Sequence, residues 1–145
     1  MESNWHKKIR KRIVEAFESQ GLRVITAHPR RLNLFREEVK RENCLSDADI
    51  VVFGNGRIEK IIEIESEPNP KKMIGIIIAT HLCNRLRAES NNYALRNIML
   101  EIRYREPVPK SKKALKLGVI EESLQEMIKK VEGSVSHFSF NMEAG

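Results

Sequence analysis

Three acidic residues, Asp49, Glu63 and Glu65, have the types and spacing that could bind a divalent cation. Glu63 and Glu65 alternate with isoleucines, so on a β-strand the two carboxylates point to one face and the isoleucines to the other. Two carboxylates on one face of such an apolar strand are costly unless a cation meets them. Asp49 lies one hairpin earlier and could complete the cluster. Oxygen ligands of this kind suit a hard cation, Mg²⁺ or Mn²⁺.

A cation at this cluster would polarise the scissile phosphate of a phosphodiester and lower the pKa of an attacking water. Glu65 is the candidate to orient or deprotonate that water. Asp47 competes with Asp49 for the cation, because both have the same strand parity. Asp47 lies nearer the strand start and is expected in a turn, whereas Asp49 is expected inside the apolar strand. The alternative is that Glu63 and Glu65 form an exposed strand face bridged to neighbouring Lys or Arg side chains.

Histidines and cysteines give little support for a zinc site. His28 and His81 are far apart in the sequence, and Cys44 and Cys83 lack CxxC spacing. His81 is expected to be a partly buried structural residue. The cysteines are expected to be free thiols, which favours an intracellular, cytoplasmic protein.

The secondary structure follows from hydrophobic periodicity and from capping residues. Ser3 and Gly21 bound a first helix, Asn69-Pro70 suits the start of a later one, and residues 54–56 (Gly-Asn-Gly) are a strong hairpin signal. The expected elements are a helix at 3–20, a strand at 22–27, a helical or loop segment at 30–42, strands at 49–53 and 58–65, a helix at 71–88, a strand at 97–103, a helix at 111–131 and an edge strand with Phe138 and Phe140. This order predicts an α/β domain with a mixed sheet and helices on its faces.

Composition limits the class of protein. The chain of 145 residues is 41% hydrophobic and 32% charged, which fits a single globular domain, residues 1–145. No apolar run approaches the roughly 20 residues of a membrane helix. The formal net charge is +6, yet residues 47–67 hold six Asp or Glu and only two Lys or Arg. A basic chain attracts nucleic acid, and an acidic segment within it is tolerated where it holds cations, as in a metal-dependent nuclease.

Asp49, the hairpin and Glu63-Ile64-Glu65 together resemble the PD-(D/E)XK, or restriction-endonuclease-like, nuclease superfamily. The resemblance implies an αβββαβ core over about residues 3–105, with a mixed central sheet flanked by helices and an additional C-terminal helix at 111–131. It implies that Asp49 and Glu63 bind Mg²⁺. Glu65 stands where a lysine is usual, as in some restriction enzymes, and Ala48 replaces the proline that precedes the aspartate in the motif.

The resemblance suggests roles for three more residues. Lys71 or Lys72, at the start of the following helix, could supply the missing lysine. Glu15 resembles the extra acidic residue that many members carry on the first helix, although an exposed helix glutamate is an equal alternative. Several cations are candidate phosphate contacts: Arg10, Lys11, Arg12, Lys110, Lys112 and Lys113.

The expected function is therefore that of a magnesium-dependent endonuclease, a hydrolase of phosphodiester bonds in DNA. One alternative is an inactive nucleic-acid-binding or interaction module of the same fold, which the missing lysine favours. The basic charge does not distinguish DNA from RNA, so an RNA-acting protein is a second alternative. A third is a structural ion-pair network. A homodimer is expected because so small a chain has little room for recognition of its own.

Overall fold

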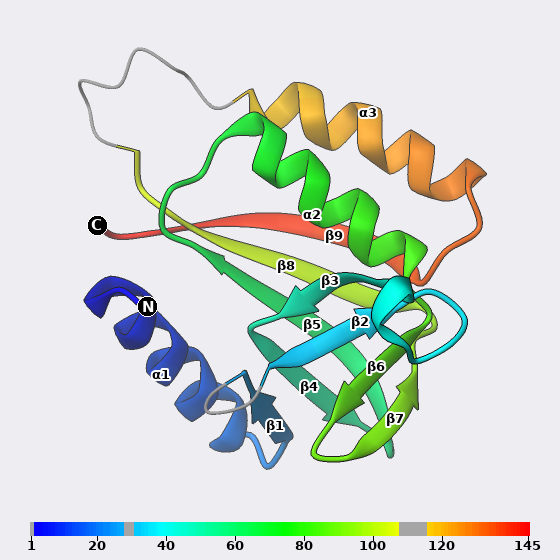
Figure 1. The fold of residues 1–145 in the computed structure, drawn as a ribbon. Coiled ribbons are helices and arrows are strands. Elements are labelled where there is room, and N and C mark those ends of the chain that lie inside the picture. Colours follow the sequence, from blue (N-terminus) through cyan, green and yellow to red (C-terminus); the bar gives the residue numbers. More distant parts are fainter. Residues whose placement is uncertain (1, 28–30, 108–115) are drawn as a thin grey trace.

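The computed structural model of the protein describes residues 2–27, 31–107 and 116–145. Within them the chain forms three α-helices, one short 3₁₀ helix and nine strands, arranged around two sheets (Figure 1). The elements are α1 (Asn4–Glu18), β1 (Arg23–Thr26), β2 (Leu32–Phe35), η1 (Arg41–Asn43), β3 (Cys44–Ala48), β4 (Ile50–Gly54), β5 (Arg57–Glu65), α2 (Pro70–Leu82), β6 (Arg85–Ala88), β7 (Asn91–Ala94), β8 (Ile98–Arg105), α3 (Leu117–Lys130) and β9 (Val135–Glu143). The expected α/β class with a mixed sheet is confirmed.

The larger sheet has five strands in the order β1-β4-β5-β8-β9. β1, β4 and β5 are antiparallel neighbours, whereas β8 runs parallel to β5 and β9 parallel to β8. Parallel neighbours need long crossover connections, and α2 and α3 lie on these two connections. The predicted edge strand around Phe138 and Phe140 is confirmed as β9.

Helix α1 covers one face of this sheet (Figure 1). The Ser3 side chain caps it by accepting a hydrogen bond from the main-chain N–H of His6, and Gly21, at a φ of 80°, ends it, as expected. Its buried residues are Trp5, Ile9 and Ile13, and they pack on Ile50, Val52, Ile62 and Ile64 of β4 and β5. Alternation along β5 therefore leaves Glu63 and Glu65 for the opposite face.

Helices α2 and α3 lie on that opposite face (Figure 1). Asn69 caps α2 as expected, because its side chain accepts a hydrogen bond from the main-chain nitrogen of Lys72, and Pro70 is the first helical residue. α3 buries Ile120, Leu124 and Ile128 in the same core. It begins at Leu117, so the first residues of the helix expected at 111–131 lie outside the described part. None of the described helices is long and apolar enough to cross a membrane.

The smaller sheet is antiparallel, in the order β3-β2-β6-β7, and the sequence analysis did not predict it. Residues 32–35 are a strand rather than a helix or loop, and the helix expected at 71–88 ends at Leu82. Leu86 and Ala88 of β6 are buried while Arg87 is exposed, a period of two that belongs to a strand. Buried residues of this sheet and of α2 belong to one hydrophobic core. Tertiary packing therefore stabilises these short strands without a strong local strand propensity.

The hairpin that carries the acidic residues forms as predicted. Asn55 and Gly56 have φ values of 53° and 76°, the two positive values of a type I′ turn between β4 and β5. Two details were wrong. Asp49 lies between β3 and β4 rather than inside a strand, and Asp47 lies in β3 rather than in a turn. Both shifts arise because the chain crosses from the smaller to the larger sheet at Asp49.

Candidate functional site

Asp49 is fixed by both its main chain and its side chain. Its carbonyl accepts a hydrogen bond from the N–H of Ala27, at 2.9 Å, which continues the pairing of β1 with β4. Its Oδ2 accepts a hydrogen bond from the N–H of Ile64, at 2.7 Å. β4 begins at Ile50, opposite Ile62, so the side chain of Asp49 takes the place of a strand partner for Ile64. The carboxylate is thereby held beside the end of β5 that carries Glu63 and Glu65.

Glu63 is the most unusual carboxyl of the described chain. It is 8% exposed, and its Oε1 has no hydrogen-bond partner among the described residues. Burial, the nearby charges of Asp49 and Asp47 and a hydrogen bond with Asp49 raise the pKa of Glu63 well above its usual range, and Glu65 adds to this shift. A buried oxygen that lacks a donor is costly, so a cation at this point would relieve both the burial and the repulsion.

Glu65 is paired with the first turn of α2. Lys72 Nζ lies 3.2 Å from Glu65 Oε1 and 3.5 Å from the carbonyl oxygen of Glu67. The Asn69 cap places Lys72 on the turn that faces the end of β5. Lys72 thus places an ammonium group beside the Glu65 carboxylate.

Helix α1 supplies a histidine to the site, and sequence reasoning missed it. His6 Nε2 lies 3.4 Å from Asp49 Oδ1, and His6 Nδ1 lies 2.7 Å from Glu2 Oε2. Arg10 donates from Nε and Nη2 to the two oxygens of Glu2, at 2.9 and 3.0 Å. The hydrogen bond with Asp49 raises the pKa of His6 against the opposing effect of burial. The spacing of Glu2, His6 and Arg10, four residues each, was the available signal.

A small cavity of about 230 Å³ opens beside these carboxylates. It is lined by Ala27, Arg31, Leu32, Asp47, Ala48 and Asp49. The charge of Arg31 acts on Asp47, where it opposes the pKa-raising effects of desolvation and of Asp49. The cavity therefore offers both a negative and a positive group to a bound molecule.

The carboxylates do not converge on one point as they stand. Within residues 2–27, 31–107 and 116–145, no three His, Cys, Asp or Glu side chains are grouped as ligands of a single ion. Asp49 is turned toward His6 and the end of β5, and Glu65 is turned toward Lys72. The unpartnered oxygen of Glu63 is the feature that fits a cation, and side-chain rotation of Asp49 or Glu65 would be needed to complete its coordination.

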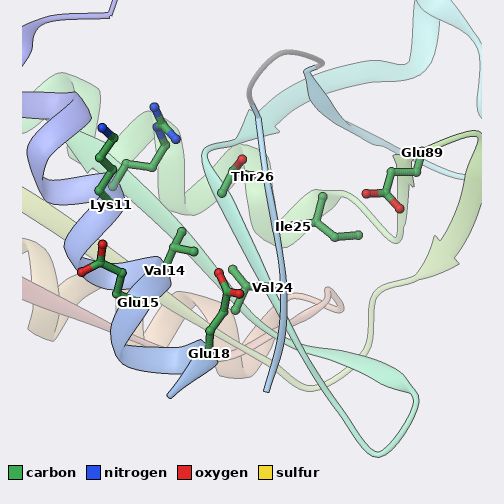
Figure 2. Close-up of a pocket in the computed structure, with 9 residues that line it drawn as sticks. Lys11, Val14, Glu15, Glu18, Val24, Ile25, Thr26 and Glu89 are labelled. Atoms are coloured by element: carbon green, nitrogen blue, oxygen red, sulfur yellow. The ribbon is translucent and has the colours of Figure 1, made fainter. Parts of the chain in front are cut away.

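Glu15 lies on another part of the surface. It lines a groove of about 550 Å³ between α1 and β1, together with Lys11, Val14 and Glu18 (Figure 2). His6, two to three turns earlier on the same helix, is the α1 residue that contacts Asp49. Among the interactions of the described residues, none joins Glu15 to the acidic cluster.

The candidate phosphate contacts are dispersed. Lys11 is exposed on α1, Arg10 is engaged with Glu2, and Arg12 is paired with Glu143. Lys71, the other candidate for the missing lysine, is exposed. Three further candidates, Lys110, Lys112 and Lys113, lie outside the described residues.

His81 has a structural role, and the two cysteines are not part of this site. His81 is 2% exposed, its Nε2 lies 2.6 Å from the carbonyl oxygen of Val131, and its Nδ1 accepts from the N–H of Val135 at 3.2 Å. The expectation of a structural histidine is confirmed. Cys44 and Cys83 are free thiols, and burial raises the pKa of Cys83 to about 11.

Comparison of the chain with models of known protein families, with characterised proteins and with solved structures found no match. Its function is therefore inferred from its own residues and their arrangement.

Proposed function

We propose that this protein is a magnesium-dependent nuclease that hydrolyses phosphodiester bonds in DNA. The observation that carries the proposal is the buried carboxyl of Glu63, whose Oε1 lacks a partner while Asp49 stands beside it. An apolar residue at this position would avoid the cost of burying a carboxyl, so its presence is best explained by a cation that it binds.

The order of elements supports the restriction-endonuclease-like fold. α1, the antiparallel strands β1, β4 and β5, then α2 and the parallel strand β8 follow the αβββαβ order expected for that superfamily. The pairs β2–β3 and β6–β7 are insertions into this order, and they form the smaller sheet together. Asp49 immediately precedes β4, and Glu63 and Glu65 lie in the last part of the neighbouring β5, an arrangement that is compatible with the motif of that superfamily.

In this proposal Asp49 and Glu63 hold Mg²⁺ (or Mn²⁺). The metal would supply Lewis-acid stabilisation of the phosphate and lower the pKa of an attacking water. Glu65 orients or deprotonates that water, and Lys72 fixes the Glu65 carboxylate by their contact at 3.2 Å. His6 holds the remaining oxygen of Asp49, at 3.4 Å, so α1 helps to set the orientation of a ligand carboxylate.

The cations around the cluster suit a polyanionic substrate. His6 and Arg10 of α1 and Lys72 of α2 stand beside the carboxylates. The exposed face of α1 adds Lys7, Lys8 and Lys11. A phosphate backbone that lies along α1 would meet these charges on its way to the acidic cluster, with binding that weakens as salt is raised.

A nuclease assay with Mg²⁺ or Mn²⁺ on single-stranded, double-stranded and branched DNA tests the proposal. Glu63→Gln removes the charge and keeps the shape, and Glu59→Gln, an exposed glutamate of the same strand, is the matched control. We expect cleavage by the wild type and by Glu59→Gln, and a loss of at least about 100-fold in Glu63→Gln. Equal activity of the two variants would overturn the proposal.

The second candidate is a nucleic-acid-binding module without activity. The observation in its favour is the pairing of Glu65 with Lys72, which neutralises the carboxylate that the reaction needs. DNA binding that persists unchanged in Glu63→Gln and without metal, with no cleavage by the wild type, would select this candidate. The same assay with RNA substrates tests whether the protein acts on DNA or on RNA.

A further inference from the structure

Strand β9 forms an unusual outer edge of the larger sheet. It has nine residues, whereas the other outer strands, β1, β3 and β7, have four, five and four. Long outer strands present a row of main-chain donors and acceptors to other chains, so proteins usually shorten or block them. β9 is therefore the place in the described fold where strand pairing with another chain is most readily made.

Main-chain contacts show which residues of β9 face outward. The carbonyl of Glu143 accepts a hydrogen bond from the N–H of Glu106, beyond the end of β8, so Glu143 and the residues of its parity face β8. The carbonyl of Phe138 accepts instead from the side chain of Gln125 on α3, at 3.3 Å. Beyond the β-bulge at Ser136, the alternate residues of β9, namely Phe138, Phe140 and Met142, thus direct their main-chain groups away from the sheet.

β9 has a β-bulge near its start, but beyond that point it lacks the cationic and proline residues that block many edges. It contains no Lys, Arg or Pro. Its one charged residue, Glu143, is at the end and is ion-paired with Arg103, at 3.0 Å, and with Arg12. Met142, at 57% exposure, adds an apolar side chain at the same edge. The strand is therefore uncharged along the stretch that a partner strand would occupy.

We propose that β9 binds β9 of a second copy of this chain in antiparallel orientation, around a two-fold axis at Ser139. This register pairs the outward main-chain groups of Phe138 with those of the partner's Phe140, and the reverse. The two aromatic side chains, which pack edge to face within each copy with 5.5 Å between ring centroids, then form a four-ring row across the axis. The two five-stranded sheets become one sheet of ten strands.

Charges on α3 favour the same two-fold arrangement. Gln125 marks the level of the axis along α3, because it donates to the carbonyl of Phe138. A carbonyl oxygen has two lone pairs, so this bond is compatible with a partner strand. Exposed Glu121 and Glu122 precede that level, and exposed Lys129 and Lys130 follow it, with Glu126 beside Gln125 paired to Lys129 at 3.9 Å. The axis reverses one helix against the other, so acidic ends meet basic ends, which identifies a second copy as the fitting occupant.

Sedimentation analysis of the full chain tests the interface. Ser139→Lys places two like charges opposite each other at the axis, and we expect it to weaken dimerisation by about fivefold or more. Ser139→Glu should do the same, and an equimolar mixture of the two variants should restore the dimer as a heterodimer. Leu45→Lys, at an exposed apolar residue of β3, is the control and should dimerise like the wild type. A wild type that stays monomeric throughout the micromolar range would overturn the proposal, as would a dimer that Ser139→Lys leaves intact.

Disulfide trapping tests the register. In this register Ser139 lies opposite Ser139 of the second copy in a non-hydrogen-bonded pair. The Cα separation of such a pair, roughly 4.5 Å, suits a disulfide. In a Cys44→Ser background, Ser139→Cys should therefore cross-link under mild oxidation. His137→Cys should not cross-link with itself but should do so when mixed with Asn141→Cys, its predicted opposite residue. Cross-linking of His137→Cys alone, with none at Ser139→Cys, would exclude this register.

Discussion

The side chain of Asp49 serves as a strand partner for Ile64, with 2.7 Å between Oδ2 and the main-chain nitrogen. β4 begins only at Ile50, one residue after Asp49, where the chain arrives from the smaller sheet. No main-chain acceptor of β4 therefore reaches this N–H. One carboxylate thus completes the hydrogen bonding of β5 and stands beside the buried Glu63. In the proposed nuclease, Asp49 would serve both stability and chemistry, and mutation can separate the two roles.

Asp49→Asn and Asp49→Ala should differ in stability. Asparagine keeps an oxygen that accepts from the N–H of Ile64, whereas alanine leaves this donor without a partner. We expect Asp49→Ala to lower the free energy of unfolding by about 1–3 kcal/mol and Asp49→Asn to lower it by less. Urea unfolding measures both. If the two variants lost the same stability, the strand-capping role of Asp49 would be wrong. The proposed nuclease activity should be lost in both variants.

Glu63 should make the protein less stable as pH rises. Its pKa is raised in the folded state above the ordinary 4.5, so the folded protein binds the proton more tightly than the unfolded chain. The stability that this proton gives is present below the unfolded pKa and is lost as pH rises toward the folded pKa. In Glu63→Gln this contribution is removed, so its unfolding free energy should fall less over the same interval. If the unfolding free energy of Glu63→Gln changed with pH in parallel with that of the wild type in metal-free buffer, the raised pKa of Glu63 would be contradicted.

Divalent metal should oppose that loss of stability. A cation that binds the ionised Glu63 and Asp49 stabilises only the folded state, by about 2.7 kcal/mol at a metal concentration 100 times its Kd. Because the ligand carboxyls must be deprotonated, the rise in Tm with Mn²⁺ should grow with pH. Thermal unfolding with and without Mn²⁺ measures this, and Glu63→Gln should show little rise. An equal rise in both proteins would place the bound metal elsewhere.

Lys72 and Lys71 form a matched pair for the missing lysine of the motif. Both side chains are exposed, but Lys72 contacts Glu65 at 3.2 Å, whereas Lys71 has no ion pair among the described residues. We expect Lys72→Met to reduce cleavage by roughly 10- to 100-fold, because the Glu65 carboxylate loses the partner that orients it. Lys71→Met should stay near wild type, and both should change stability by less than about 0.5 kcal/mol. Equal activities of the two variants would remove Lys72 from the site.

Two glycines should respond to alanine in opposite directions. A Cβ at Gly133 would meet the carbonyl oxygen and the ring of His81, which is itself held by Val131 and Val135. Gly133→Ala should therefore cost about 1–3 kcal/mol of stability. Gly75 lies within α2 with nothing within 4 Å, so Gly75→Ala should stabilise by roughly 0.5–1 kcal/mol. Chemical unfolding of both variants checks the contrast, and a neutral Gly133→Ala would show that the α3–β9 connection can shift.

Local features of the sequence determined the first helix, the β4–β5 hairpin and the start of α2. The Ser3 cap, the Asn55-Gly56 turn and the Asn69-Pro70 pair act within a few residues, so their effects are legible without knowledge of the rest of the fold. Alternation along β5 likewise determined that Glu63 and Glu65 share a face.

Tertiary structure alone decided the smaller sheet and the partners of the acidic residues. β2 pairs with β6 across some fifty residues of chain, and His6 reaches Asp49 from another element, so neither contact leaves a local pattern. The burial that raises the pKa of Glu63 likewise depends on tertiary packing. The sequence determined which groups are available for chemistry, and the packing of distant segments decided which of them meet, because pairing between strands and desolvation are properties of neighbours in space rather than in sequence.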